Sequence, residues 1–289
     1  MEQIKSQTIK PENDIVSLFK DEFTSTVIPV YIKSIDKELN FREVSVSEYK
    51  KFAKVAIDNA NNPATIYRAM SGLIENVMLS EADFNSLTEL DRIHILFNLS
   101  QTIVLDQNHA ITCPNCKLEY KMQPDIAKIN TEFDNIDMTD KVYTIEDANR
   151  IYIFTVNFPT IRRMIDTLDY FQKTNNGPSS DDENSINGNT LGIAMAYIHA
   201  YIKSITIERK NKGGNITADF TKMSADKIEE IIGVIPQSIF NSASETGLVA
   251  KINSDFIDKA NSVFQKEKCP SCGKEFPGVI GSISDFLFS

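Results

Sequence analysis

Several features that often point to a function are scarce or missing in this 289-residue sequence, which has no tryptophan, three histidines and four cysteines. No apolar run approaches the roughly 20 residues that a membrane-spanning helix needs, and the first segment, MEQIKSQTIKPEND, lacks the apolar core of a signal peptide. We therefore expect no membrane contact and a location in the cytoplasm of the cell that makes the protein. The motifs H-E-x-x-H and G-x-S-x-G, the phosphate-binding loop and the dinucleotide fingerprint are all missing. We expect no enzyme and no catalytic residue.

Positive charge is also in short supply. Lysine and arginine number 30 against 40 aspartates and glutamates, which gives a net charge of −10. Nucleic-acid-binding proteins usually show a basic stripe, because neutralised phosphates supply much of their affinity. The densest basic cluster here is ERKNK at 208–212, which has the pattern of a solvated turn before Gly213 and Gly214. We expect no nucleic-acid partner, and the acidic surface should keep the chain soluble until it meets a protein partner.

The first part of the chain predicts strands followed by helices. Residues 1–24 are polar, and we predict an arm that either docks on a protein surface or stays a loose terminus. Residues 25–107 are predicted to form a strand pair, VIPVYIK and ELNFREV, and then a helical bundle. Three helix starts are indicated by two S-x-x-E capping boxes and one Asn-Pro pair, namely Ser45 with Glu48, Asn62 with Pro63, and Ser86 with Glu89.

The remainder, 108–289, is predicted to be a mixed α/β region. Strand patterns cover 142–145 and 151–158, and a further strand pair surrounds the two glycines at 213–214. Helical patterns begin at Pro159, at 190–203 and after Ser224, the last clear helix. Residues 173–189 hold almost no apolar side chain, so we predict a mobile loop there. The fold class predicted is α+β: a strand pair with a helical bundle, then a mixed region closed by a composite zinc site.

That site is predicted from the cysteines, which all occur in two C-P-x-C turns, CPNC at 113–116 and CPSC at 269–272. Zinc in structural sites takes four soft ligands in a tetrahedron, and two such turns present four thiolates. The predicted ligands are Cys113, Cys116, Cys269 and Cys272. Because 152 residues separate Cys116 from Cys269, the metal would tie the middle of the chain to its end.

Other interpretations of the cysteines stay open. The site could form between two chains, with one turn from each, and His109 could replace one thiolate. The C-P-x-C pattern also occurs in glutaredoxin-type redox sites, where it begins a helix. Neither turn here precedes a helical pattern, which disfavours redox chemistry. Disulfides within the turns are disfavoured in a reducing cytosol.

The order of these features resembles the baseplate hub assembly proteins of T-even-type contractile-tailed bacteriophages. The resemblance rests on an FRxxxVxEYK-like stretch, a Leu-Asp-Arg helix, and a C-terminal C-P-x-C followed by aromatic residues. The matching residues are Phe41, Arg42, Val46, Glu48, Tyr49 and Lys50; Leu90, Asp91 and Arg92; and Cys269, Cys272, Phe286 and Phe288. The resemblance covers the first 125 residues well and the last 25 moderately. The region between them is similar only in its alternation of strands and helices.

This resemblance implies a non-enzymatic role in building the baseplate hub, as a transient chaperone or as a retained subunit. The implied partners are other tail hub proteins, and the implied location is the host cytoplasm during assembly or the virion baseplate. Two segments are candidate anchors for a partner, the arm at 1–24 and the apolar tail from Ile280 to Phe288. The alternative for the tail is that it packs on the protein's own core. The alternative function is a zinc-ribbon module that contacts nucleic acid or the transcription machinery.

Overall fold

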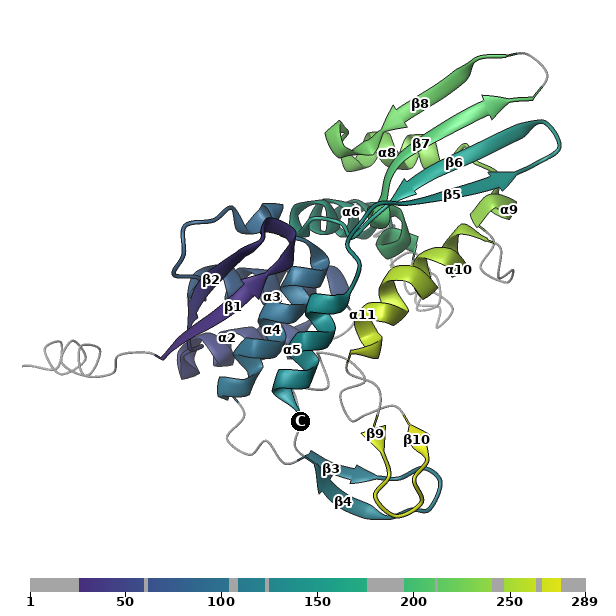
Figure 1. Ribbon diagram of the computed structural model, residues 1–289. Helices are drawn as coiled ribbons and strands as arrows, with labels where there is room; N and C mark the ends of the chain where they lie inside the picture. The colour runs from purple at the N-terminus through teal and green to yellow at the C-terminus, as the bar shows by residue number, and fades with distance from the viewer. Residues whose placement is uncertain are drawn as a thin grey trace, which may run out of the picture.

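The computed structural model describes residues 26–59, 62–103, 109–122, 125–175, 195–210, 213–240, 247–263 and 267–276 (Figure 1). The predicted arm at 1–24, the apolar tail and most of the predicted loop at 173–189 lie outside these residues. Only residues 173–175 of that loop are described, and they are helical, contrary to the prediction, because they continue the preceding helix to Asn175.

An antiparallel hairpin begins the described chain. Strand β1 (Val27–Ile32) pairs with β2 (Lys37–Arg42) across a single 3-10 turn, η1 (Lys33–Ile35). Alternate side chains point into the core, as the period of two in the sequence predicts, and the fully or nearly fully buried ones are Val30, Ile32, Leu39 and Phe41. The predicted strand pair is confirmed.

Helices α2 (Val46–Asp58), α3 (Pro63–Val77), α4 (Glu89–Ile103) and α5 (Ile126–Asn135) pack behind this hairpin (Figure 1). The first begins as predicted, since Ser45 and Glu48 form a complete capping box. The second has Pro63 in its first turn and the Asn62 side chain accepting a hydrogen bond from the amide of Thr65, at 3.1 Å. Helix α5 was not predicted.

The predicted cap of α4 was wrong. Thr88, not Ser86, caps this helix: the Asp91 amide donates to its hydroxyl at 3.3 Å, and its own amide donates to the Asp91 carboxylate at 2.8 Å. Ser86 belongs to a short 3-10 turn, η2 (Phe84–Ser86), and its hydroxyl donates to the carbonyl of Asp83. Both S-x-x-E and T-x-x-D fit a capping pattern, and the reciprocal hydrogen bonds of Thr88 and Asp91 start the helix at the second of them.

A four-stranded antiparallel sheet follows, in the order β5 (Lys141–Glu146), β6 (Arg150–Val156), β7 (Ile202–Arg209) and β8 (Asn215–Asp219). Helix α6 (Ile161–Asn175) and helical residues 195–201 lie between the middle two strands in sequence. The predicted helix at 190–203 therefore ends too late, because Ile202 already belongs to β7. Gly213 and Gly214 make the last hairpin turn with positive φ angles of 61° and 89°, which glycine adopts without steric cost.

The C-terminal part is more helical than the sequence predicts. After η3 (Phe220–Lys222) come α8 (Ala225–Ile232), α9 (Gln237–Phe240), α10 (Leu248–Ile252), a π-helical turn η4 (Asn253–Ile257) and α11 (Asp258–Ser262). The last three form one continuous run. Its deeply buried residues recur every four positions, at Leu248, Ile252, Phe256 and Ala260. That period exceeds the 3.6 residues of an α-turn, and the wider π turn keeps the stripe facing the core.

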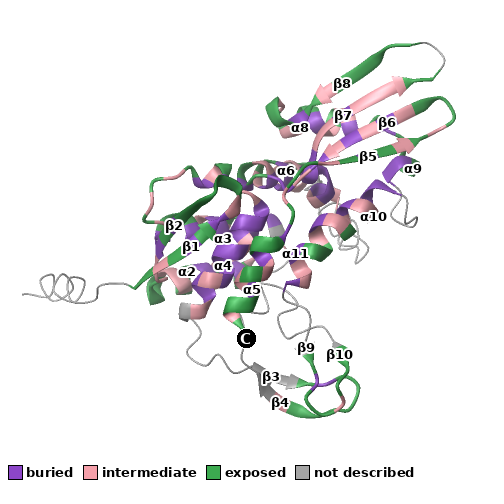
Figure 2. Cartoon of the chain, in the orientation of Figure 1, coloured by how far each residue is buried: buried purple, intermediate pink, exposed green. Residues whose placement is uncertain are grey.

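One connected hydrophobic core joins the hairpin, the bundle, the sheet and the C-terminal run. Figure 2 shows the buried residues concentrated in the bundle and at the base of the sheet, whereas the far end of the sheet is mostly exposed or half-buried. A mixed α/β fold with an N-terminal strand pair, helices and a second sheet confirms the predicted class. No described helix has both the length and the apolar character that crossing a membrane requires.

Candidate metal centre

The two C-P-x-C turns lie at the tips of two short hairpins. The first hairpin is β3 (His109–Thr112) with β4 (Glu119–Met122), and the second is β9 (Glu267–Lys268) with β10 (Glu275–Phe276). Figure 1 shows the two hairpins together below the helical body, although they come from the middle and the end of the chain. Their meeting is what the composite site requires.

The two turns have the same backbone conformation. In the first, the amide of Cys113 donates to the carbonyl of Leu118 at 2.9 Å, and the amide of Lys117 donates back to the Cys113 carbonyl at 2.9 Å. In the second, Cys269 pairs with Lys274 at 3.0 Å, and the Gly273 amide donates to the Cys269 carbonyl at 2.9 Å. The centre is therefore built from two matching halves.

The residue after each second cysteine is left-handed, with φ of 59° at Lys117 and 67° at Gly273. This conformation suits glycine and is strained for lysine. The first turn adopts this strained conformation at Lys117, and the Lys117 amide still donates its hydrogen bond to the Cys113 carbonyl. The departure from glycine at Lys117 does not prevent the first turn from forming.

The four sulfur atoms converge. The Sγ atoms of Cys113 and Cys272 are 3.8 Å apart, those of Cys116 and Cys269 are 3.6 Å apart, and all four lie within 4.8 Å of one another. A tetrahedral zinc with Zn–S bonds of about 2.3 Å requires sulfur separations of about 3.8 Å. None of the four is in a disulfide. The cluster could bind a metal ion, and its donor type and dimensions fit a tetrahedral thiolate site.

Burial differs within the cluster. Cys113 and Cys269, the first cysteine of each turn, are buried, whereas Cys116 is exposed and Cys272 is half-buried. The first cysteines therefore face the interior between the two hairpins, and the second cysteines close the site toward solvent.

Backbone amides polarise the sulfurs. The Lys274 amide, helped by the Asn115 side chain, lowers the pKa of Cys272 to about 6, and the Cys116 amide lowers the pKa of Cys113. At Cys116, the Leu118 amide acts in the same direction but is outweighed by partial desolvation of the thiol and by the neighbouring sulfurs, which raise its pKa to about 11. Amides that point at sulfur favour the thiolate, the form that binds metal.

Asn115 connects the two halves. Its Oδ1 atom accepts a hydrogen bond from Nζ of Lys274 at 2.9 Å, and its side chain also hydrogen-bonds to Cys272 of the opposite turn. Ser271 occupies the equivalent place in the second turn. This contact between the turns was not predicted, and no sequence pattern marks it.

The side chains of His94 and His199 make packing and hydrogen-bond contacts within the fold. His94 contacts Asn130 at 2.9 Å and stacks on Phe133. His199 contacts the Glu229 carboxylate at 2.8 Å in a buried pair. His109 lies in β3, but its side chain is outside the described residues. The four cysteines are the one group of possible metal ligands found among the described side chains.

The residues of the FRxxxVxEYK-like stretch have a structural explanation. Arg42 donates two hydrogen bonds to the Glu48 carboxylate, at 2.7 and 2.9 Å, and the same carboxylate accepts from the Ser45 amide at 3.0 Å. Arg42 also donates to the carbonyl of Asn76 at 3.1 Å, at the end of α3. The motif thus joins β2, α2 and α3 through one bidentate ion pair.

The Leu-Asp-Arg helix contains a second such pair, which is buried. Arg92 donates to Glu89 at 2.6 and 2.7 Å, and its guanidinium lies 4.1 Å from the centre of the Tyr67 ring. The Tyr67 hydroxyl donates to the same carboxylate. Burial and the Glu89 charge raise the pKa of Tyr67 far above its ordinary value. These groups fix α3 against α4.

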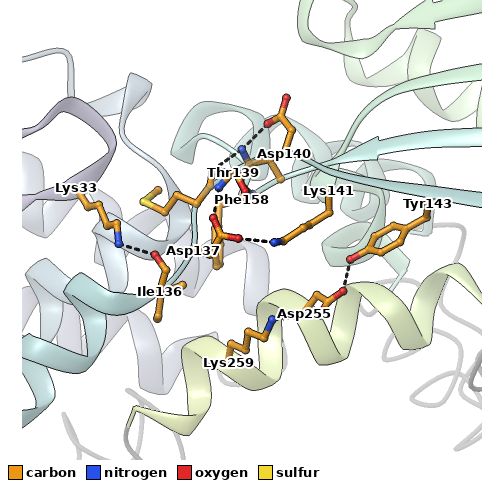
Figure 3. A network of polar contacts seen from close by, with 12 residues as sticks. Lys33, Ile136, Asp137, Thr139, Asp140, Lys141, Tyr143, Phe158, Asp255 and Lys259 are labelled. Carbon is orange, nitrogen blue, oxygen red and sulfur yellow. Dashed lines mark hydrogen bonds and ion pairs between the residues drawn. The ribbon is translucent and has the colours of Figure 1, made fainter.

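A polar network that the sequence did not predict joins the hairpin, the sheet and the C-terminal run (Figure 3). Lys33 donates to the carbonyl of Ile136 at 2.6 Å, Lys141 pairs with Asp137, and the Tyr143 hydroxyl donates to Asp255 at 2.6 Å. These contacts lie at the junction of the bundle, the sheet and η4 (Figure 3). The contacts of Lys33 with Ile136 and of Tyr143 with Asp255 join residues more than 100 positions apart, so no local motif reveals them.

Fold and site together define a mixed α/β protein in which a four-cysteine centre brings the middle and the end of the chain together. The chain matches the family described as T4 bacteriophage base plate protein over residues 25–288, nearly its whole length, and belongs to that family. The resemblance found in the sequence is thereby confirmed. No curated protein and no solved structure matches the chain. Its partners, as for the family, are other phage baseplate proteins.

Proposed function

We propose that this chain is a non-enzymatic baseplate hub component or hub assembly chaperone, which acts through protein–protein contacts and is held together by a structural zinc ion. The zinc ligands in this proposal are Cys113, Cys116, Cys269 and Cys272. The observation that carries it is the convergence of four sulfurs within 4.8 Å from turns far apart in a baseplate family member. Four thiolates leave no open position for a substrate, so the metal is structural and not catalytic.

The surroundings of the centre favour this role over a redox site. The first turn leads into strand β4 and the second into strand β10, so no helix begins at either cysteine pair. A redox site of the glutaredoxin type needs the helix N-terminus to activate its first thiol. The matched turns supply four ligands for a metal instead.

The surroundings of the centre also favour a structural zinc site over a nucleic-acid-binding module. The described lysines at the cysteine turns, Lys117, Lys268 and Lys274, alternate with Glu119 and Glu275, and the whole chain is acidic. A nucleic-acid surface would need a continuous basic patch. We therefore do not propose a nucleic-acid partner for this protein.

Two measurements test it. Elemental analysis of the purified full-length protein should find one zinc per chain, and material purified in its native state without metal would refute the zinc. Mass spectrometry of purified tails and of host lysate during assembly should then locate the chain. Its presence in finished tails identifies a hub component, and its presence in assembly intermediates alone identifies a chaperone. Absence from both would refute the hub role.

A further inference from the structure

A large pocket lies away from the cysteine centre, between α4, the helical residues 195–201 and the C-terminal run. Its volume is about 790 Å³, within the range typical of ligand and peptide sites. Its apolar lining includes Ile93, Met195, Ile198, Phe240, Val249 and Ile257. The buried carboxylate of Glu89 also lines it but is already paired with Arg92.

Uncharged polar groups stand among these apolar residues. Gln237 and Ser238 are exposed, and Asn253 and Asn261 are half-buried, all on the helices of the C-terminal part. Amides and hydroxyls of this kind pair with peptide N–H and C=O groups, whereas the apolar lining accepts aliphatic or aromatic side chains. The chemistry fits an apolar peptide segment with few charges.

We propose that this pocket receives the chain's own C-terminal segment, residues 277–289. This segment, PGVIGSISDFLFS, lies outside the described residues and carries one acidic and no basic side chain. Six of its thirteen residues are large and apolar, including Phe286, Leu287 and Phe288. Burial of each of these side chains would make the free energy of docking more favourable, as it does for an anchor residue in a preformed pocket.

The chain path permits this. Asn261 lines the pocket, and six residues further on Glu267 begins β9, so at most about 22 Å separates them. Phe276 pairs directly with Glu267, about 5 Å across the hairpin. From there 13 residues can extend about 45 Å, which exceeds the distance back to the pocket.

The other segments outside the described residues fit less well. Residues 176–194 contain three large apolar side chains among nineteen residues, Ile186, Leu191 and Ile193, against six among thirteen in the C-terminal segment, and residues 241–246 contain none. The arm before β1 has apolar residues such as Phe19 and Phe23, but β1 lies on the opposite side of the bundle from α10 and α11 (Figure 1). The C-terminal segment combines the composition and the position that the pocket requires.

Photocrosslinking in the full-length protein tests the proposal. A p-benzoylphenylalanine at Phe286 should crosslink, within the same chain, to pocket residues such as Met195 or Ile257, located by mass spectrometry. The same group at Val234, which is 79% exposed and outside the pocket, serves as the control and should not. Changing the pocket rim by Ser238→Trp or Asn261→Arg should lower the Phe286 crosslink about tenfold, whereas Asp258→Arg, on the exposed side of α11, should leave it unchanged.

Three outcomes would overturn the proposal: crosslinks to another part of the chain, crosslinks that join two chains, or crosslinks into the pocket from a group at Phe19 instead. Circular dichroism of each rim variant separates loss of the fold from loss of docking. If a rim variant unfolds, the crosslink map of the otherwise unchanged protein still decides. The zinc content is independent of this test, so failure here leaves the proposed function standing.

Discussion

Loss of the metal, by chelation or by Cys269→Ser, is expected to destabilise the whole protein and not just the two cysteine hairpins. The centre joins residues 116 and 269 across 152 intervening residues, with sulfurs 3.6 Å apart. Closing a loop of that length restricts the unfolded chain by about 5 kcal/mol in the chain-entropy treatment of crosslinks. That is a large part of the roughly 5–15 kcal/mol by which domains are usually stable. The free energy of unfolding should fall by several kcal/mol.

Urea denaturation followed by far-ultraviolet circular dichroism measures this loss. The Cys269→Ser variant and the wild-type protein in excess chelator should reach the same lowered midpoint, because both lack the same crosslink. Chelator should have no further effect on the variant. Ser271→Ala, at an exposed position of the same turn that supplies no ligand, is the matched control and should behave as wild type. An unchanged midpoint in Cys269→Ser, or additive effects of chelator and substitution, would refute the crosslink.

Three further predictions concern single side chains. Lys117→Gly should raise the melting temperature of the zinc-loaded protein and Gly273→Ala should lower it, each by the equivalent of about 1 kcal/mol, because both positions are left-handed. No atom lies within 4 Å of a Cβ added at Gly273, so a steric clash would not explain the loss there. A shift of the melting temperature in the same direction for both variants would contradict this. Arg92→Leu should cost about 3–5 kcal/mol in urea unfolding because it leaves the buried Glu89 carboxylate unpaired, and a loss below about 1 kcal/mol would show the pair to be dispensable. Arg42 and Ser45 lower the pKa of Glu48 from 4.5 to about 2, so its stabilising effect is complete above pH 4.5 and is lost as the pH falls toward 2. Acid titration of unfolding should therefore be steeper in that window for wild type than for Glu48→Gln, and identical slopes would count against the pair.

Local patterns predicted much of the fold. Alternation gave the β1–β2 hairpin, and the Ser45 and Asn62 signals gave the starts of α2 and α3, because these depend on neighbours within a few residues. Helix α5 was missed although Asp125 caps it and Ile129 and Phe133 are buried at helical spacing. Its short amphipathic pattern could have been found. The run from α10 to α11 was also missed, although its buried residues Leu248, Ile252, Phe256 and Ala260 recur at the helical spacing of four.

The convergence of the cysteines was predictable because two matched C-P-x-C turns share one chemistry. Their hydrogen-bonded partners were not. The Asn115 contact with Lys274 and the Tyr143 contact with Asp255 join residues more than 100 positions apart, and each partner alone resembles an ordinary surface residue. Pairings of this kind depend on the packed arrangement of whole elements. Whether the chain divides into regions at 107, as predicted, is a hypothesis for limited proteolysis.

The distance between the two cysteine turns also affects the timing of synthesis. Ribosomes add about 5–20 residues per second, so the first sulfur pair emerges roughly 8–30 seconds before its counterpart. During that interval the nascent polypeptide has only half of a binding site, and a product that stops early never acquires the rest. Completion of the cluster thus reports that translation has passed Cys272, and copies that stop earlier remain without the crosslink that would stabilise them.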